Sequence, residues 1–284
     1  MAPDGSRRIV WMIKRTIKEH PTEDRMPRQE STPERGIAEP AVPRGAADRD
    51  AKGQTAYADH ARGGGLGTLP AMEMLVIGGH GKVGLRLLRL LARDGHHGRG
   101  VIRTAEQAGD LEAVGAEPVL CDLERGDDLR PHLGAADAIM FAAGAGPGSG
   151  PARKRTVDYG AAVTSMQAAI DLGVTRFVIV SSIGTHDIAG AGEAMRPYLQ
   201  AKRDADDALK QSGLDWTIVK PGHLTDTPGS GRVQVSRTFG RRADVPRDDV
   251  ALVLLECLHA PNTIGVEFEL FEGDVPAREA VRSL

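Results

Sequence analysis

The stretch Met74-Leu75-Val76-Ile77-Gly78-Gly79-His80-Gly81-Lys82-Val83-Gly84 decides the fold of this chain. Four apolar residues precede a glycine turn, and leucines at helical spacing follow it over 85–91. The glycines satisfy two overlapping patterns, G-x-G-x-x-G from Gly79 and G-x-x-G-x-x-G from Gly78. In such a unit one glycine makes the turn, another admits a pyrophosphate to the backbone, and the last lets helix pack on strand. We therefore predict the first strand, turn and helix of a dinucleotide-binding βαβ unit.

The helix after the turn also predicts where the phosphates bind. Its first N–H groups have no intrahelical partner, and its dipole is positive at that end. The residues that we expect at the cofactor here are Gly78, Gly79, Gly81, Lys82, Val83 and Gly84.

Composition limits the class of protein. At 284 residues and 40% hydrophobic content, the chain can bury one sizeable core. A net charge of −3 gives no electrostatic reason to expect nucleic acid or an anionic membrane as a partner. No apolar run approaches the roughly 18 to 20 residues that cross a bilayer. We expect a cytoplasmic protein, with a small molecule as its partner.

The cysteines and histidines argue against a metal site. Two cysteines, Cys121 and Cys257, fall in a predicted strand and a predicted helix, which favours a reducing compartment without disulfides. The nine histidines show no ligand spacing, and we place His96 and His97 in a solvated turn. We predict no structural or catalytic metal.

Residues 1–71 have the composition of a disordered extension, rich in charges of both signs and in proline. A short helix over 9–17 is the strongest element that we expect there. Residues 6–12 resemble a twin-arginine signal, but the apolar segment behind them is too short for one. A partner-binding arm is an alternative, as is translation that starts at Met72 or Met74, which would make the extension an artefact of start-site assignment.

From residue 72 to 284, strands and helices alternate, which predicts one α/β domain with a Rossmann-type, doubly wound parallel sheet. After the first unit we predict strands at 99–102, 117–121, 137–142, 176–180, 216–219 and 266–271. We predict helices at 106–114, 155–172, 197–211 and 247–259, and a short one at the end. Val157, Ala161, Ala168 and Leu172 form the expected apolar face of the long helix at 155–172. The segment 222–242 is the expected substrate lid, within a small C-terminal substrate-binding portion.

Residues at the carboxyl ends of the strands are the candidates for ligand contacts. Arg103 follows the second strand, where a protein selective for NAD usually has an acidic residue, so we favour NADP with its 2′-phosphate bound to the guanidinium. Asp122 and Leu123 follow the third strand and are placed for the adenine. Ala143 and Gly144 follow the fourth and are expected beside the nicotinamide ribose.

Tyr198 and Lys202 are four residues apart on a predicted helix and therefore share one face. A phenol with a pKa near 10 is a poor acid or base at neutral pH unless a nearby cation stabilises its phenolate. The lysine one turn away provides that cation. The pair therefore predicts a general acid or base beside the bound nicotinamide.

From 72 to 284 the chain resembles the short-chain dehydrogenase/reductase family, in its atypical branch of NAD(P)-binding, NmrA-like and epimerase-like members. The resemblance rests on the glycine motif at 78–84, on Cys121-Asp122-Leu123, Lys154-Arg155-Thr156-Val157-Asp158-Tyr159-Gly160-Ala161, Val180-Ser181-Ser182, Tyr198 with Lys202, and Leu214-Asp215-Trp216-Thr217-Ile218-Val219-Lys220-Pro221-Gly222.

The resemblance implies roles for single residues. Tyr198 would protonate a carbonyl oxygen as hydride arrives from NADPH, and Lys202 would lower its pKa and hold the nicotinamide ribose. Ser182 would orient the carbonyl, with Ser181 as the alternative if the register differs by one. Pro221 would shape the wall beside the nicotinamide.

One residue departs from the family pattern. Asp158 stands where many members carry a proton-relay asparagine, which alters the usual relay, although its carboxylate is still able to hold a water.

Three functions remain open from the sequence. The leading one is an NADP(H)-dependent oxidoreductase acting on a small carbonyl or alcohol, as a monomer or homodimer. The second is an NAD(P)-dependent sugar epimerase or dehydratase, and the third is a non-catalytic NADP(H) sensor.

Overall fold

The computed structural model describes residues 70–146, 148–238 and 240–284 of the chain. The expectations for residues 1–69, including the disordered extension, the helix at 9–17 and the signal-like segment, lie outside the described residues. Met72 lies just before the first strand.

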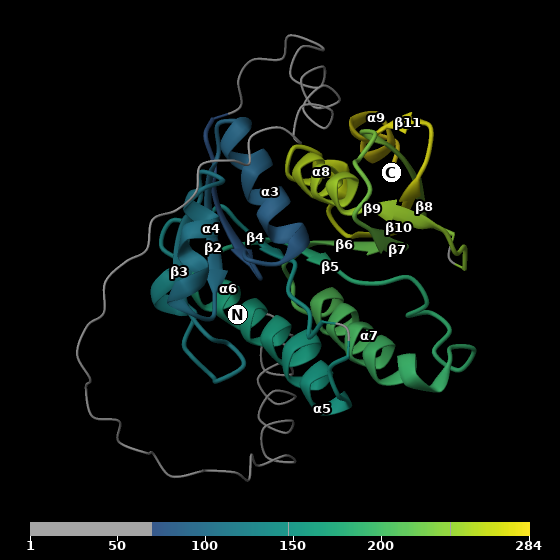
Figure 1. Cartoon of the computed structure of the whole chain (residues 1–284), viewed down its shortest axis with the longest axis horizontal. Helices are drawn as coiled ribbons and strands as arrows, with labels where there is room; N and C mark the ends of the chain where they lie inside the picture. The colour runs from purple at the N-terminus through teal and green to yellow at the C-terminus, as the bar shows by residue number, and fades with distance from the viewer. Residues whose placement is uncertain (1–69, 147, 239) are drawn as a thin grey trace, which may run out of the picture.

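One large sheet organises the described part of the chain (Figure 1). Its order is β11-β8-β10-β6-β5-β4-β1-β2-β3. These strands are β1 (Glu73–Ile77), β2 (His97–Ile102), β3 (Glu117–Leu120), β4 (Ala138–Phe141), β5 (Arg176–Val180), β6 (Asp215–Pro221), β8 (Arg232–Ser236), β10 (Val266–Glu272) and β11 (Val275–Pro276). The strands from β3 to β10 in this order are parallel, whereas β8 runs antiparallel to β10 and β11. The sheet is therefore Rossmann-like, as predicted, with an antiparallel edge.

Helices cover both faces of the sheet (Figure 1). On one face lie α3 (Lys82–Arg93), α4 (Ala108–Glu112), α8 (Arg247–Leu258) and α9 (Ala277–Arg282); on the other lie α5 (Pro151–Lys154), η4 (Arg155–Ala161), α6 (Ala162–Leu172) and α7 (Arg196–Lys210). Single 3-10 turns are η2 (Ala105–Gln107), η3 (Arg130–His132), η5 (Glu193–Met195) and η6 (Pro261–Thr263).

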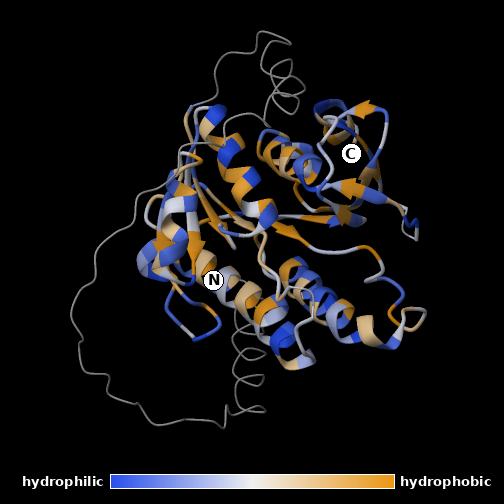
Figure 2. Ribbon diagram, in the orientation of Figure 1, coloured by the Kyte–Doolittle hydropathy of each residue, from blue (hydrophilic) through white to orange (hydrophobic). Residues whose placement is uncertain are grey.

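The two layers of core follow from strand periodicity. In β1, Met74 and Val76 join the core under α3 and α8, while Leu75 and Ile77 join the core under α6 and α7. Side chains alternate between the faces of a strand, so a strand covered on both sides must be apolar throughout. Figure 2 shows hydrophobic residues along the central strands and hydrophilic ones on the outer sides of the helices.

The predicted helix at 155–172 begins earlier and changes type along its length. It starts at Pro151, after Gly150, and runs through the π-helical segment η4 before α6. Proline suits a first helical position, because its missing N–H needs no partner there. The apolar face is as predicted except at Leu172, which is 49% exposed in the last turn.

The expectation for the two neighbouring histidines was wrong in part. His96 is not solvated: it is 7% exposed, its Nδ1 accepts a hydrogen bond from the Met72 amide, and its Nε2 lies 2.9 Å from Nε2 of His259. His97 belongs to β2. The segment 222–242, expected as a lid, contains two strands that were not predicted: β7 (His223–Thr225) pairs with β9 (Asp244–Pro246), and β8 joins β10.

Both cysteines are buried and free. No helix in the described part of the chain is sufficiently long and apolar to span a bilayer.

Candidate active site

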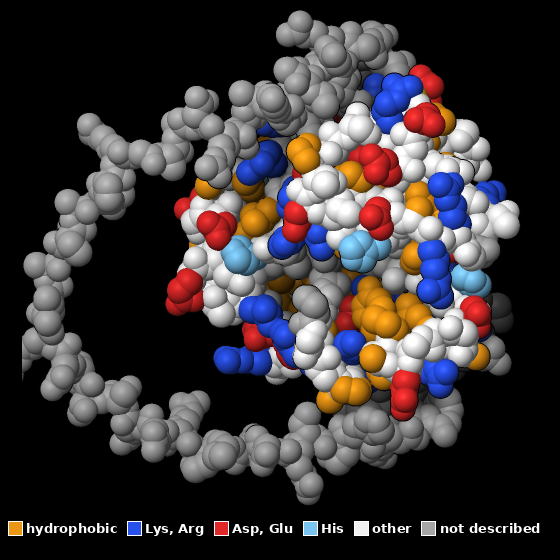
Figure 3. Space-filling view, turned by 45° about the vertical axis from the view of Figure 1, so that its right-hand side comes forward, with side chains coloured by type: hydrophobic (Ala, Val, Ile, Leu, Met, Phe, Trp, Pro, Cys, Tyr) orange, Lys and Arg blue, Asp and Glu red, His pale blue; other side chains and the backbone are white. Residues whose placement is uncertain are grey.

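A cavity of about 710 Å³ opens at the carboxyl ends of the parallel strands. Its lining comes from the loops after β1, β2, β3, β4 and β5, and from α5, η4 and α7. Figure 3 shows a recess near the centre of one face, with Lys and Arg side chains beside it. Ligands of open α/β sheets bind at this edge, near the point where the strand order reverses, which here lies between β1 and β4.

The glycine turn fits a dinucleotide pyrophosphate. A Cβ on Gly79 would lie 2.7 Å from Gly100 Cα, and one on Gly84 would lie 2.3 Å from the Gly78 oxygen, so neither position tolerates a side chain. Gly81 is the N-cap of α3, so no capping side chain binds the first N–H groups of this helix. Lys82 and Val83 in the first turn line the cavity. The turn therefore presents backbone N–H groups and a positive helix end to the cavity.

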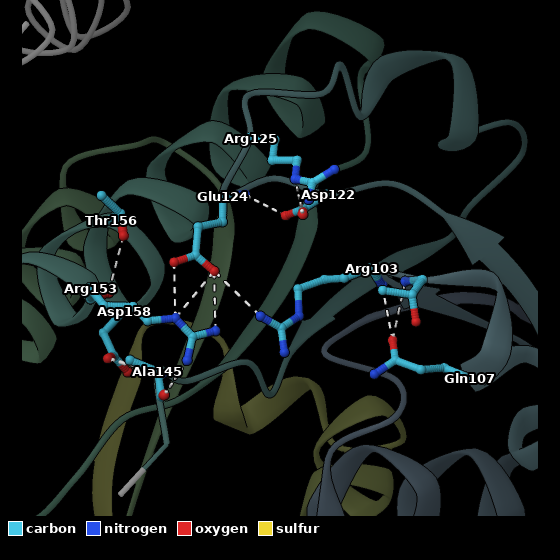
Figure 4. A network of polar contacts seen from close by, with 10 residues as sticks. Arg103, Gln107, Asp122, Glu124, Arg125, Ala145, Arg153, Thr156 and Asp158 are labelled. Atoms are coloured by element: carbon cyan, nitrogen blue, oxygen red, sulfur yellow. Dashed lines mark hydrogen bonds and ion pairs between the residues drawn. The ribbon is translucent and has the colours of Figure 1, made fainter. Parts of the chain in front are cut away.

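Arg103 and Arg153 converge on one carboxylate (Figure 4). Arg153 on α5 binds Glu124 through Nε at 2.9 Å and Nη2 at 3.1 Å, whereas Arg103 Nη1 lies 3.4 Å away. The hydrogen bond from Arg153 lowers the pKa of the Glu124 carboxyl. Since Arg153 already neutralises Glu124, the guanidinium of Arg103, 52% exposed, stays available to an anion.

Four of the other predicted cofactor residues line the cavity, and one does not. Asp122, Leu123, Ala143 and Gly144 all line the cavity. The Asp122 carboxylate also accepts a hydrogen bond from the Glu124 amide at 3.0 Å (Figure 4). Pro221 is buried at the end of β6 and is not among the described residues that line the cavity.

Lys202 is buried in the floor of the cavity, with 4% of its side chain exposed. Its ammonium donates to the Val180 carbonyl at 3.0 Å and lies 3.2 Å from Asp158 Oδ1. Burial opposes the charge, but electrostatic interactions with Tyr198 and Asp158 prevail and raise the pKa of Lys202. Lys202 is therefore a fixed, permanent cation.

Asp158 is fully buried and links three parts of the site. Besides Lys202, its Oδ2 accepts a hydrogen bond from the Ala145 amide at 3.2 Å. A Cβ on Gly144 would lie 3.2 Å from Oδ1. The carboxylate therefore holds the loop after β4 against the lysine, which an asparagine would do without adding a negative charge.

Tyr198, half-buried on α7, lines the same cavity as the glycine turn and Lys202. The ammonium of Lys154, also in the lining, lies 5.7 Å from the centroid of its ring. The structure thus brings the tyrosine and lysine of the sequence motif to the predicted cofactor cavity.

The two serines after β5 differ in position. Ser181 lines the cavity, but its hydroxyl donates to Asp206 Oδ2 at 2.8 Å. Ser182 is not among the described lining residues, and its carbonyl accepts a hydrogen bond from Thr185. The alternative register is therefore the one that places a serine at the cavity.

Asp206 was missed by the sequence reasoning. Burial raises the pKa of its carboxyl to about 6, against the attraction of Lys220 and the hydrogen bond from Ser181. Its Oδ1 is buried without a hydrogen-bond partner among the described residues. A signal was present, because Asp206 follows Tyr198 and Lys202 at the same four-residue spacing. Arg153 and Glu124 were also missed, since their sequence neighbourhood shows no motif for them. Lys154 begins one of the stretches that carry the resemblance, but it was given no role.

Comparisons with known proteins agree with this geometry. The family model described as NAD(P)H-binding matches residues 78–261. The uncharacterized sugar epimerase YhfK of Bacillus subtilis is 38% identical over 215 residues, covering 75% of this chain and all of that protein.

Solved structures are also similar. A provisionally assigned NAD-dependent epimerase/dehydratase from Bacillus halodurans is 40% identical with a TM-score of 0.73, covering 75% of this chain and 100% of that one. The anaerobilin reductase ChuY of Escherichia coli O157:H7 is 27% identical with a TM-score of 0.61, covering 72% and 98%. The chain therefore belongs to the NAD(P)H-binding family, in the atypical branch of the short-chain dehydrogenases/reductases that includes NmrA-like and epimerase-like proteins.

Proposed function

We propose that this protein is an NADP(H)-dependent oxidoreductase that interconverts a small carbonyl compound and its alcohol. The observation that carries the proposal is that Tyr198 and Lys202 line the same cavity as the glycine turn. A nicotinamide cofactor supplies or takes up the hydride when it is bound. The protein then has to bind the substrate, orient it, and move one proton.

Tyr198 moves that proton. Its hydroxyl gives a proton to the carbonyl oxygen during reduction and becomes a phenolate, and that phenolate takes the proton from the alcohol during oxidation. The ammonium of Lys202 lies one helical turn away and favours the phenolate electrostatically. Because Asp158 lies 3.2 Å from Lys202, its negative charge offsets part of this effect while fixing the ammonium in position. Ser181 lies in the same cavity, with its hydroxyl held by Asp206.

The preference for NADP rests on the charges around Arg103. An acidic residue at this place would bind ribose hydroxyls and repel a 2′-phosphate. Glu124 is the carboxylate closest to that role, and Arg153 holds it through two nitrogens. With two arginines and one carboxylate, the cluster keeps a net positive charge that favours the additional phosphate.

A sugar epimerase is the second candidate, favoured by the descriptions of YhfK and of the B. halodurans protein. In this reaction the same tyrosine would remove a proton from a sugar hydroxyl and return it later. The two candidates differ in whether the cofactor is consumed.

The test compares the wild-type protein with Tyr198→Phe for NADPH consumption across a panel of carbonyl compounds. We expect the variant to bind NADPH normally and to lose about 10²- to 10⁴-fold in turnover, the usual contribution of general acid catalysis. Tyr159→Phe is the matched control, because Tyr159 is buried beside the site in η4 and does not line the cavity.

Other outcomes point elsewhere. Equal turnover by wild type and Tyr198→Phe would exclude the proposed acid. Conversion of a sugar nucleotide without net cofactor consumption would identify an epimerase. Tight NADPH binding without turnover of any compound would identify the sensor.

A further inference from the structure

Lys154 is a cation at the reactive end of the cavity that the cofactor does not account for. It is the last residue of α5, which lies beside α7 in Figure 1, and its side chain is partly buried. Its Nζ lies 5.7 Å from the ring centroid of Tyr198, and both residues line the cavity. The ammonium is therefore within a side chain's length of the place where the substrate carbonyl meets the phenol.

The other Lys and Arg residues of the cavity lining have carboxylate partners. Glu124 pairs with Arg103 and Arg153, Asp226 with Lys82 and Arg247, and Asp158 with Lys202. Within residues 70–146, 148–238 and 240–284, only the contact with the Tyr198 ring is recorded for the Lys154 ammonium. A half-buried cation over an aromatic ring gains little compared with one bound to an anion.

The phosphates expected from the cofactor belong to another part of the cavity. The pyrophosphate fits the glycine turn after β1, and the 2′-phosphate fits Arg103 after β2. Lys154 instead lies with Tyr198 on the α5 and α7 side, where the nicotinamide reacts under the proposed function. Among the described residues no carboxylate pairs with it, so its ammonium is open to an anion that enters the cavity.

We propose that the substrate carries an anionic group, a carboxylate or a phosphate, next to its reacting carbonyl, and that Lys154 binds this group. The inference rests on the proposed function, because it takes Tyr198 as the residue that holds the carbonyl oxygen. The ammonium then fixes the orientation of the substrate relative to the phenol. A charge-assisted hydrogen bond of this kind selects the acid over its neutral ester.

The test measures binding without turnover, on the full chain saturated with NADP⁺, which cannot reduce a ketone. Two probe pairs share a carbonyl and differ in charge: benzoylformate with its methyl ester, and dihydroxyacetone phosphate with dihydroxyacetone. In at least one pair we expect the anion to bind about tenfold or more tightly than its neutral partner. The pair that shows this preference distinguishes carboxylate from phosphate.

Variants assign the preference to one residue. Lys154→Gln is expected to abolish the preference for the anion and to leave the affinity for the neutral partner within about twofold. Arg203→Gln removes the same charge from the exposed side of α7, away from the cavity, and is expected to keep the preference.

The inference is overturned if neutral and anionic probes bind equally, if neither binds, or if the preference survives in Lys154→Gln. NADPH turnover of the same probes is measured separately. Anion-selective binding without any turnover would contradict the proposed oxidoreductase function and leave Lys154 as an anion site. Failure of the inference about Lys154 and failure of the proposed function can therefore be told apart.

Discussion

At the scale of single residues, Arg103 controls the proposed cofactor preference through one partly exposed guanidinium. We expect Arg103→Ala to weaken NADPH binding by about 10- to 100-fold and NADH binding by less than about threefold, because only NADPH carries the 2′-phosphate. Arg130→Ala removes the same charge outside the cavity and should change neither value. Dissociation constants for NADPH and NADH from cofactor fluorescence titrations test this prediction. If the ratio of the two constants is the same in Arg103→Ala as in the wild type, the reason for preferring NADP is removed.

The buried carboxyl of Asp206 makes stability depend on pH. Its pKa, raised from 3.8 to about 6, means that the folded protein binds more protons than the unfolded chain between about pH 4 and pH 6. The free energy of unfolding should therefore fall as pH rises through this window, by up to about 3 kcal/mol. In Asp206→Asn this fall should be absent.

Urea unfolding at several pH values between 4 and 7 measures the effect. Asp207→Asn is the matched control, because its side chain is 52% exposed on the same helix and has only a weak contact with Arg203. If Asp206→Asn and wild type show the same pH slope, the carboxyl titrates normally and its burial has no energetic consequence.

Residues of the site differ in how far the sequence predicted them. Tyr198 and Lys202 were found because helical spacing alone puts them on one face. Ser181 was ranked behind Ser182 because a strand end shifted by one residue turns the side chain to the other side. Lys154 lies in a stretch that carries the resemblance, but nothing local places it at Tyr198, because its position depends on how α5 packs against α7.

At the scale of elements, the contact between the glycine turn and α3 is the tightest feature of the site. Gly84→Ala would drive a methyl group into the carbonyl oxygens of Gly78 and Gly79, at 2.3 and 2.8 Å. We expect a loss of about 1–3 kcal/mol in stability, as for other overpacked contacts. NADPH affinity should drop at least tenfold because the turn opens.

Gly109→Ala provides the comparison in α4, where a Cβ meets no atom within 4 Å. Alanine is favoured over glycine in a helix by up to about 1 kcal/mol, so this variant should be unchanged or slightly more stable. Thermal unfolding and NADPH titration of both variants give the result. A stable Gly84→Ala that binds NADPH normally would contradict the assigned role of the turn.

Most elements were predictable because their apolar periods are unambiguous, as for 176–180, which matches β5 to the residue. The strand β8 was missed although Arg232-Val233-Gln234-Val235-Ser236 alternates polar and apolar residues, because the surrounding Gly, Ser and Thr suggested a loop. Its antiparallel place beside β10 depends on pairing over a long sequence separation, which no local pattern encodes.

At the scale of the whole molecule, the features that the sequence did not predict depend on contacts between segments that lie far apart in the chain. His96 was expected in solvent, yet it is buried against His259, which lies 163 positions further along the chain. Similarly, Asp226 follows β7 and pairs with Lys82 at the start of α3 and with Arg247 at the start of α8. These ties join the C-terminal portion to the glycine turn, so the chain from β1 to α9 acts as one unit.

Because the chain from β1 to α9 acts as one unit, we predict that removal of the first 69 residues changes neither its stability nor its NADPH affinity. The described backbone contacts of the first strand begin at Met72, whose carbonyl accepts from the His97 amide, and the described cavity lining begins at Ile77. A chain that starts at Pro70 should therefore match the full chain within about 2 °C in unfolding temperature and twofold in NADPH affinity. A chain that starts at Gly78 lacks β1, the strand between β4 and β2, and should not fold. Loss of NADPH binding in the chain from Pro70 would show that the preceding segment takes part in the site.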